Sequence, residues 1–156
     1  MPMQNSRHCD FAIIVTGMKR VRKFFGLSAC DRTLLLRTAV VLIVVRVSLW
    51  LAPFRSILRV LPRLRGSRAC ASADRLMWSV CCAARFVPYA TCLVQALALH
   101  ILMSGAGYGS CVRIGCASGD GKPEAHAWLE AGGQVLLGGP DIERYNQLLV
   151  IGAARQ

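Results

Sequence analysis

Acidic side chains are scarce in this sequence. Only 8 Asp and Glu stand against 19 Lys and Arg, which gives a formal net charge of +11 at pH 7. A chain so short of acids is attracted to an anionic partner, whether an acidic peptide, a nucleic acid or a membrane surface. The basic residues concentrate between Lys19 and Arg75, and the part from Cys92 onward is nearly balanced. The basic region therefore indicates docking, separate from any chemistry.

Motifs for metals, phosphates and serine nucleophiles are also missing. The sequence has no HExxH, no phosphate-binding loop spacing and no Ser-centred nucleophile elbow. The adjacent pair Cys81-Cys82 and the four-residue gap between Cys111 and Cys116 fit no common zinc ligand spacing. We therefore expect reduced thiols, most of them buried, and neither a metal nor a cofactor. Because the basic region lacks interleaved aromatic residues, we expect no nucleic-acid partner.

The N-terminus carries no secretory signal, because Asp10 is acidic and the apolar run at 11–15 is too short. We therefore expect a cytoplasmic protein. The longest apolar stretch, at 34–54, is interrupted by Arg37 and Arg46, so no uncharged run in it is long enough to span a membrane. These arginines lie about 180° apart around a helix. We expect a helix largely buried in a helical subdomain, with membrane contact as the alternative.

The pattern of the chain predicts three parts. Residues 1–32 are expected to be a flexible basic N-terminal segment and residues 33–87 a helical subdomain, with a basic amphipathic helix at 54–66 and another helix at 69–86. Residues 88–156 are expected to form the core. This core has a helix at 92–103, strands at 108–116, 124–131 and 134–137, and an apolar segment at 145–151. Gly132-Gly133 predicts a two-residue hairpin turn. The fold class is therefore α+β, with helices first and then one helix against a small antiparallel sheet.

Cys92 lies at the predicted start of a helix, just after Thr91, whose side chain could cap it. Unpaired amides and the positive end of the helix dipole stabilise a thiolate at such a position, and the same amides can face an oxyanion. A cysteine is usually a buried structural thiol, but this position favours a nucleophile. Gln95, one turn later, could donate to an oxyanion, although ordinary helix surface is the simpler interpretation.

His126 is the candidate base. His8 lies in the N-terminal segment, and His100 lies about 12 Å along the helix from Cys92, so neither can reach the thiol. The expected strand places His126 on one face together with Trp128 and Glu130, and the small side chains beside it on the other face. A lone histidine on a strand is more often a satisfied polar group, so its partners decide its role.

The acid that would orient His126 is less well defined. Glu130 lies on the same strand, about 13 Å away and too far for a hydrogen bond. Asp141 follows a hairpin return and can come back beside the histidine strand, whereas Asp120 lies in a turn on the opposite side of that strand. We therefore predict a triad of Cys92, His126 and Asp141, the layout that a thiol nucleophile needs.

Three segments, TCLVQALALHIL, VRIG and AHAWLEAGGQVLLGG, resemble the transglutaminase-like cysteine peptidases that remove the leader from lasso-peptide precursors in bacteria. The resemblance implies a papain-like or transglutaminase-like core with Cys92 as nucleophile and His126 as base. It implies a free-standing protease, because the stretch before Leu34 is too short for a leader-recognition domain. Its expected partners are the precursor peptide, a separate leader-recognition protein and an asparagine-synthetase-like macrolactam cyclase. Many relatives carry Asn-Asp where this chain has Gly138, so the resemblance leaves the orienting residue open.

Two functions of different classes follow from these observations. The first is a cysteine peptidase that removes a leader through an acyl-enzyme, for which a transfer reaction to an amine would use the same residues. The second is a basic, membrane-associated adaptor or binding protein without catalysis, supported by the region 33–65. Faster alkylation of Cys92 than of the other thiols would favour the peptidase.

Overall fold

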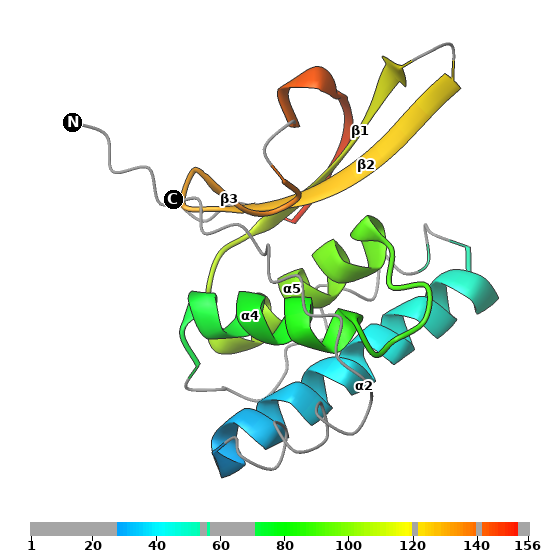
Figure 1. Ribbon diagram of the computed structural model, residues 1–156. Coiled ribbons are helices and arrows are strands. Elements are labelled where there is room, and N and C mark those ends of the chain that lie inside the picture. Colours follow the sequence, from blue (N-terminus) through cyan, green and yellow to red (C-terminus); the bar gives the residue numbers. More distant parts are fainter. Residues whose placement is uncertain (1–27, 54–55, 57–70, 120–121, 140–141, 153–156) are drawn as a thin grey trace. The chain divides into compact units, whose positions relative to one another are not determined.

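The computed structural model describes residues 28–53, 56, 71–119, 122–139 and 142–152 (Figure 1). Two compact units divide the chain, residues 1–33 and 34–156. The described residues form three α-helices and a four-stranded antiparallel sheet, so the predicted α+β class is confirmed. Most of the predicted N-terminal segment and nearly all of the predicted basic helix at 54–66 lie outside the described residues. The boundaries predicted at 33–87 and 88–156 stay predictions.

Helix α2, Ala29–Leu51, buries a single stripe of its surface. Ser28 begins the helix, since its Oγ accepts a hydrogen bond from the Asp31 amide at 3.1 Å. The buried side chains are Leu34, Thr38, Leu42 and Val45, which follow one another at helical spacing. The other side of the helix exposes large apolar side chains, namely Leu36, Val40, Ile43, Val44, Val47, Trp50 and Leu51. The prediction of a largely buried helix is therefore wrong, because only one face of α2 contacts the rest of its unit.

Helices α4, Ala73–Ala84, and α5, Cys92–Ala106, differ in how much they bury. Ser72 caps α4, and Leu76, Val80 and Ala83 on one side of this helix are buried. Helix α5 is apolar on nearly every side and buried over most of its length, as expected for the central helix of a small core. It ends at Gly107, whose φ of 90° is the left-handed conformation that glycine adopts at little cost.

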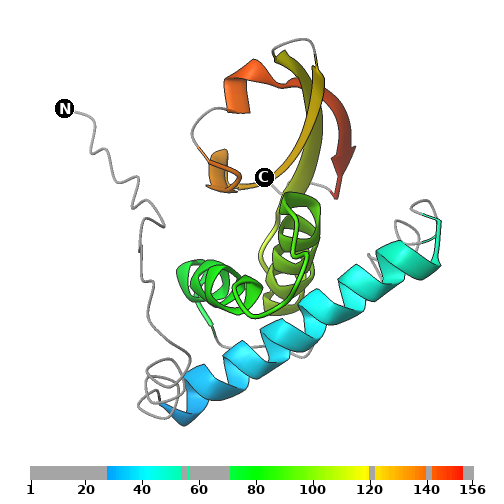
Figure 2. The ribbon, with the colours of Figure 1, turned by 45° about the vertical axis from the view of Figure 1, so that its right-hand side comes forward.

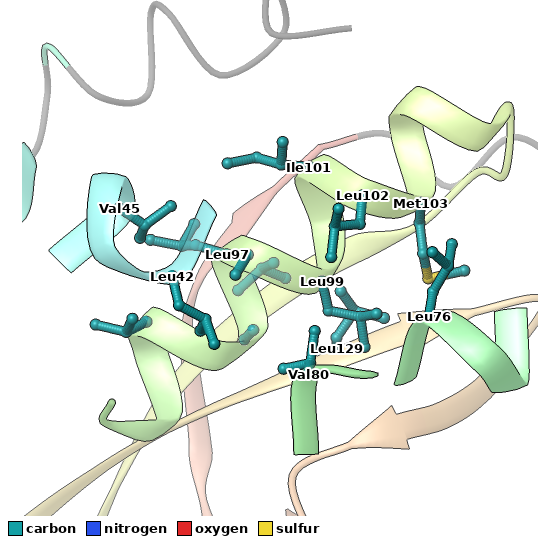
Figure 3. Packing of buried hydrophobic residues seen from close by; sticks show 14 of the residues in the cluster. Leu42, Val45, Leu76, Val80, Leu97, Leu99, Ile101, Leu102, Met103 and Leu129 are labelled. Atoms are coloured by element: carbon teal, nitrogen blue, oxygen red, sulfur yellow. The ribbon is translucent and has the colours of Figure 1, made fainter. Parts of the chain in front are cut away.

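Side chains of α5 fill the centre of the core (Figure 3). Leu97 and Leu99 are fully buried in a cluster to which α2 contributes Leu42 and α4 contributes Val80. From the sheet, Leu129 joins the same cluster and is fully buried. One buried polar contact links two of the helices, because Thr38 Oγ1 lies 2.9 Å from Ser79 Oγ. The core therefore fixes α5 between the other helices and the sheet.

The sheet has the strand order β3-β2-β1-β4. Its strands are β1, Cys111–Gly119, β2, Lys122–Ala131, β3, Gln134–Leu137, and β4, Asn146–Ile151, and the short 3-10 helix η2, Ile142–Arg144, precedes β4. Gly132 and Gly133 have φ of 57° and 75°, so the predicted two-residue hairpin turn is confirmed. The strand predicted at 108–116 begins later, at Cys111, and continues to Gly119.

The two faces of the sheet carry different side chains. Ala127 and Leu129 of β2 belong to the core that surrounds α5. His126 and Trp128, on the opposite face of the same strand, lie against Tyr145, which follows η2. In Figures 1 and 2, η2 lies on the side of the sheet away from the helices. The alternation predicted for this strand is therefore confirmed, and it separates a helix-packed face from a face that holds the histidine.

Candidate active site

Cys92 is the first residue of α5, as the sequence predicts, and its side chain is half-buried. Thr91 is the N-cap residue with an extended backbone, φ −64° and ψ 168°, but its side chain makes no cap hydrogen bond. The first amides of a helix have no acceptor within the helix. Without a capping side chain, these amides of α5 stay available to an anion beside Cys92.

The loop before Cys92 is held by its own contacts. Tyr89 has a positive φ of 59°, which is uncommon for a residue other than glycine, and its carbonyl accepts a hydrogen bond from the Thr91 amide at 2.8 Å. Gln95 donates from Nε2 to the Ala90 carbonyl at 2.6 Å. One amide hydrogen of Gln95 is therefore used to tie the loop to the first turn of α5. This contact gives Gln95 a part in positioning the segment that carries the thiol.

His126 lies near the middle of β2 and is half-buried. Its Nε2 lies 2.7 Å from the carbonyl oxygen of Gly138. A carbonyl can only accept, so Nε2 is the donor and carries the hydrogen in this contact. In the neutral ring Nδ1 is then the acceptor nitrogen. Within the part of the chain that the structure describes, no group is hydrogen-bonded to Nδ1.

Tyr145 covers one side of the His126 ring. The centroids of the two rings are 5.1 Å apart and their planes meet at 30°. The Tyr145 hydroxyl donates to Glu124 Oε1 at 2.8 Å, and Arg144 Nη2 contacts both that hydroxyl, at 2.7 Å, and Glu124 Oε2, at 2.9 Å. An exposed ion pair of this kind stabilises the fold little. Its effect here is to fix the tyrosine ring against the histidine.

Gly138 has no room for a side chain. Its φ is +139°, and a Cβ there would lie 2.2 Å from the Cβ of Trp128. Trp128 is itself buried, and its indole Nε1 donates to Glu130 Oε1 at 3.0 Å. Its ring also lies over Gly115, where a Cβ would meet ring carbons at 3.1 Å. Trp128 and two glycines thus set the backbone position from which the Gly138 carbonyl reaches His126.

The structure describes two of the three residues of the predicted triad. Cys92 begins α5 and His126 lies on β2, and α5 packs against β2. Among the described residues, no hydrogen bond joins the two side chains. Asp141 lies outside the described residues.

Two groups at the site had no part in the predicted triad: the carbonyl of Gly138 and the ring of Tyr145. A backbone carbonyl has no side-chain signature, so the turn sequence Gly138-Gly139-Pro140 gave no indication of the first contact. Alternation along the last strand could have drawn attention to Tyr145, the only aromatic residue of the segment predicted at 145–151.

His100 occupies a different environment, two turns along α5 from Cys92. It is buried, its Nδ1 lies 2.9 Å from Ser110 Oγ, and desolvation lowers its pKa below 6.5. Across the described parts of the chain, no group of three or more His, Cys, Asp or Glu side chains could hold a metal ion. Cys30, Cys92, Cys111 and Cys116 are free thiols.

Comparison with known proteins adds one finding. A family model described as Transglutaminase-like superfamily matches residues 39–150, which is more than half of the chain. The matched range contains Cys92 and His126. No curated protein and no solved structure matches the chain.

Proposed function

Because the chain belongs to the transglutaminase-like superfamily, we propose that it is a cysteine peptidase with Cys92 as nucleophile and His126 as general base. Cysteine peptidase activity is common in this superfamily. The observation that carries the assignment is the hydrogen bond of the His126 ring, which fixes its tautomer. Nε2 is bonded to the Gly138 carbonyl, which leaves the acceptor nitrogen Nδ1 for a thiol proton.

The order of contacts along α5 and β1 supports the pairing. His100 bonds to Ser110, just before β1. Cys92 lies about 12 Å back along the helix from His100. Gly115, the partner of His126 in the β1–β2 register, lies about 17 Å beyond Ser110 along the strand. Since the short turn after Gly107 reverses the chain, both displacements lead away from the His100–Ser110 contact toward the same end of the core.

Small side chains lie on the face of β2 that is turned toward the helices. Ala125 and Ala127 carry only a methyl group each, and they alternate with His126 along the strand. The strand that carries His126 can then lie close to α5, the helix that begins with Cys92. The proposed contact is between Cys92 Sγ and His126 Nδ1, because Nε2 is already engaged.

The proposed reaction has two halves. The Cys92 proton passes to His126 Nδ1, and Sγ attacks the carbonyl carbon of the scissile amide. The C–N bond breaks, the leaving amine takes the proton from the imidazolium, and a thioester remains on Cys92. Water then attacks the thioester and gives its proton to Nδ1, and the C–S bond breaks to release the acid and the thiolate. In both halves the uncapped amides of the first turn of α5 would hold the oxyanion.

The proposed substrate is the leader of a ribosomally made lasso-peptide precursor. Support comes from the resemblance of the segments around Cys92 and His126 to leader peptidases of that kind, and from the net charge of +11, which suits an acidic peptide or an acidic partner. The proposed partners are the precursor, a separate leader-recognition protein and the cyclase that acts on the freed peptide.

Incubation with a lasso-type precursor and its recognition protein, followed by mass spectrometry, tests the proposal. Wild-type protein is expected to release the leader, and Cys92→Ala is expected to bind the precursor without cutting it. Cys116→Ala is the matched control, since Cys116 is also a half-buried free thiol. Equal cleavage by wild type and Cys92→Ala, or no cleavage with any precursor of this type, would reject the assignment.

The second candidate function is a membrane-associated adaptor without catalysis, and helix α2 favours it. By length and composition α2 could cross a membrane, and only 22% of its apolar window is buried. Its large exposed apolar side chains would suit a lipid surface, and the positive charge of the chain would suit anionic lipids. Equal rates of iodoacetamide labelling at all accessible cysteines, together with sedimentation on anionic vesicles, would favour this function.

A further inference from the structure

The hydrogen bond from His126 Nε2 to the Gly138 carbonyl bears on the choice of the third catalytic group. A neutral imidazole has two nitrogens, one donor and one acceptor. If Nδ1 receives the thiol proton, Nε2 is the nitrogen that an orienting acid would bind. That position is occupied by a backbone oxygen at 2.7 Å. Nε2 is thus already bonded where the predicted triad would require a carboxylate.

From this contact we propose that the Gly138 carbonyl is the group that positions His126, and that the site works as a Cys-His pair without an orienting carboxylate. The catalytic meaning of this inference rests on the function proposed above. Gly138 acts through His126 and touches no reacting atom, so it is a positioning residue.

The sheet explains why a carbonyl lies there. Leu129 of β2 pairs with Leu137 of β3, and the register shifts between Leu129 and Glu130. Gly138, the next residue after β3, therefore comes beside Trp128, with its backbone against the tryptophan Cβ. Any side chain at 138 would meet that atom at 2.2 Å. An acid cannot occupy this position while Trp128 stays in place, and the backbone supplies the acceptor instead.

A neutral carbonyl acceptor stabilises a positively charged imidazole less than a carboxylate does. A carboxylate stabilises the imidazolium through its full negative charge, and hydrogen bonds between two ionised groups are stronger than those to neutral oxygen. A carbonyl fixes the tautomer and the ring orientation with less stabilisation of the positive ring. Positive charge that develops on the ring during proton transfer is therefore stabilised less than in a site with an acid.

Substitution of Asp141 separates the two arrangements. Asp141→Asn is expected to keep leader cleavage and iodoacetamide alkylation of Cys92 within about twofold of wild type, with the same pH profile. If the carboxylate orients the ring, the same variant should lose about 10²- to 10⁴-fold in rate and shift its pH profile. Such a loss would overturn the inference. Peptidase function itself would stand in that case, provided that Cys92→Ala is inactive and Cys116→Ala active.

A spectroscopic measurement tests the contact without any substrate. Nitrogen-15 NMR of the protein labelled at histidine is expected to show neutral His126 with hydrogen on Nε2 and a bare Nδ1, unchanged in Asp141→Asn. His126→Gln identifies the resonance. Protonation of Nδ1 in the neutral ring, or a change of tautomer in Asp141→Asn, would overturn the inference. This result does not depend on whether the protein is a peptidase.

Discussion

His100 and His126 each make one hydrogen bond to an oxygen atom, but the surroundings of the two rings differ and give them different chemistry. His100 Nδ1 lies 2.9 Å from Ser110 Oγ within α5's buried surroundings, with only 8% of the residue exposed. His126 Nε2 lies 2.7 Å from the Gly138 carbonyl, and this residue is half-buried. Burial lowers the pKa of the first ring and keeps it neutral. In the second ring, Nδ1 makes no hydrogen bond to any described residue.

The comparison shows that burial of the ring, more than the hydrogen bond itself, decides what a histidine can do. A buried ring with a polar partner is a structural element, because any charge on it is costly. A half-open ring held at one nitrogen can take up and release protons at the other. The following predictions test that distinction.

Replacement of each histidine should affect a different property. His126→Ala is expected to lower leader cleavage by about 10³-fold while the protein stays folded, because the general base is lost. His100→Asn is expected to leave the rate per folded molecule within about threefold of wild type. Cleavage rates and circular dichroism on both variants check this. Equal loss of activity in the two variants would remove the distinction.

Substitution at Gly138 should destabilise the face that holds His126. Gly138→Ala is expected to lower the free energy of unfolding by about 3 kcal/mol, since its Cβ would overlap Trp128 and its φ is +139°. Gly139→Ala is the matched control. Its φ is +80° but nothing lies within 4 Å of the added Cβ, so a loss of about 1 kcal/mol is expected. Urea unfolding measures both, and equal losses would contradict the overlap with Trp128.

The lowered pKa of His100 predicts a loss of stability in acid. Below pH 6.5, the ordinary pKa of histidine, His100 binds a proton in the unfolded chain but stays neutral in the folded chain. The free energy of unfolding therefore falls as pH falls. One such group contributes a slope of at most about 1.4 kcal/mol per pH unit, and above pH 6.5 its contribution is constant. His100→Asn should reduce this slope between pH 6.5 and 5, measured by urea unfolding. An unchanged slope would assign the effect to other groups.

The Tyr145 hydroxyl should have the smallest effect. Tyr145→Phe removes exposed hydrogen bonds to Glu124 and Arg144 but keeps the ring against His126. A loss of about 0.5 kcal/mol is expected, with leader cleavage within about twofold of wild type. Tyr145→Ala, which removes the ring, is expected to reduce cleavage more than Tyr145→Phe does. Equal rates in the two variants would show that the ring does not position the histidine.

The elements could be predicted from the sequence because their patterns are local. The apolar run after Thr91 predicted α5, and Gly132-Gly133 predicted the hairpin turn. Alternation along β2 predicted which side of the strand carries His126. Each of these follows from periodicity or from the backbone freedom of glycine.

The failures come from contacts between distant segments. Helix α2 carries apolar residues on all sides, so its sequence could not show that only the stripe of Leu34, Thr38, Leu42 and Val45 would be covered. The partner of His126 is a main-chain oxygen, and its placement depends on the β2–β3 register and on the bulk of Trp128. No side-chain pattern encodes either of these.

The close approach of Trp128 to Gly138 also limits how the protein can change over time. A side chain at 138 is tolerated only if residue 128 has first become smaller, so the two positions are coupled. Substitutions that would introduce an acid here must therefore accumulate in one order, with the tryptophan replaced before the glycine. A lineage that starts from this arrangement can place an acid at position 138 only after Trp128 has been replaced by a smaller residue.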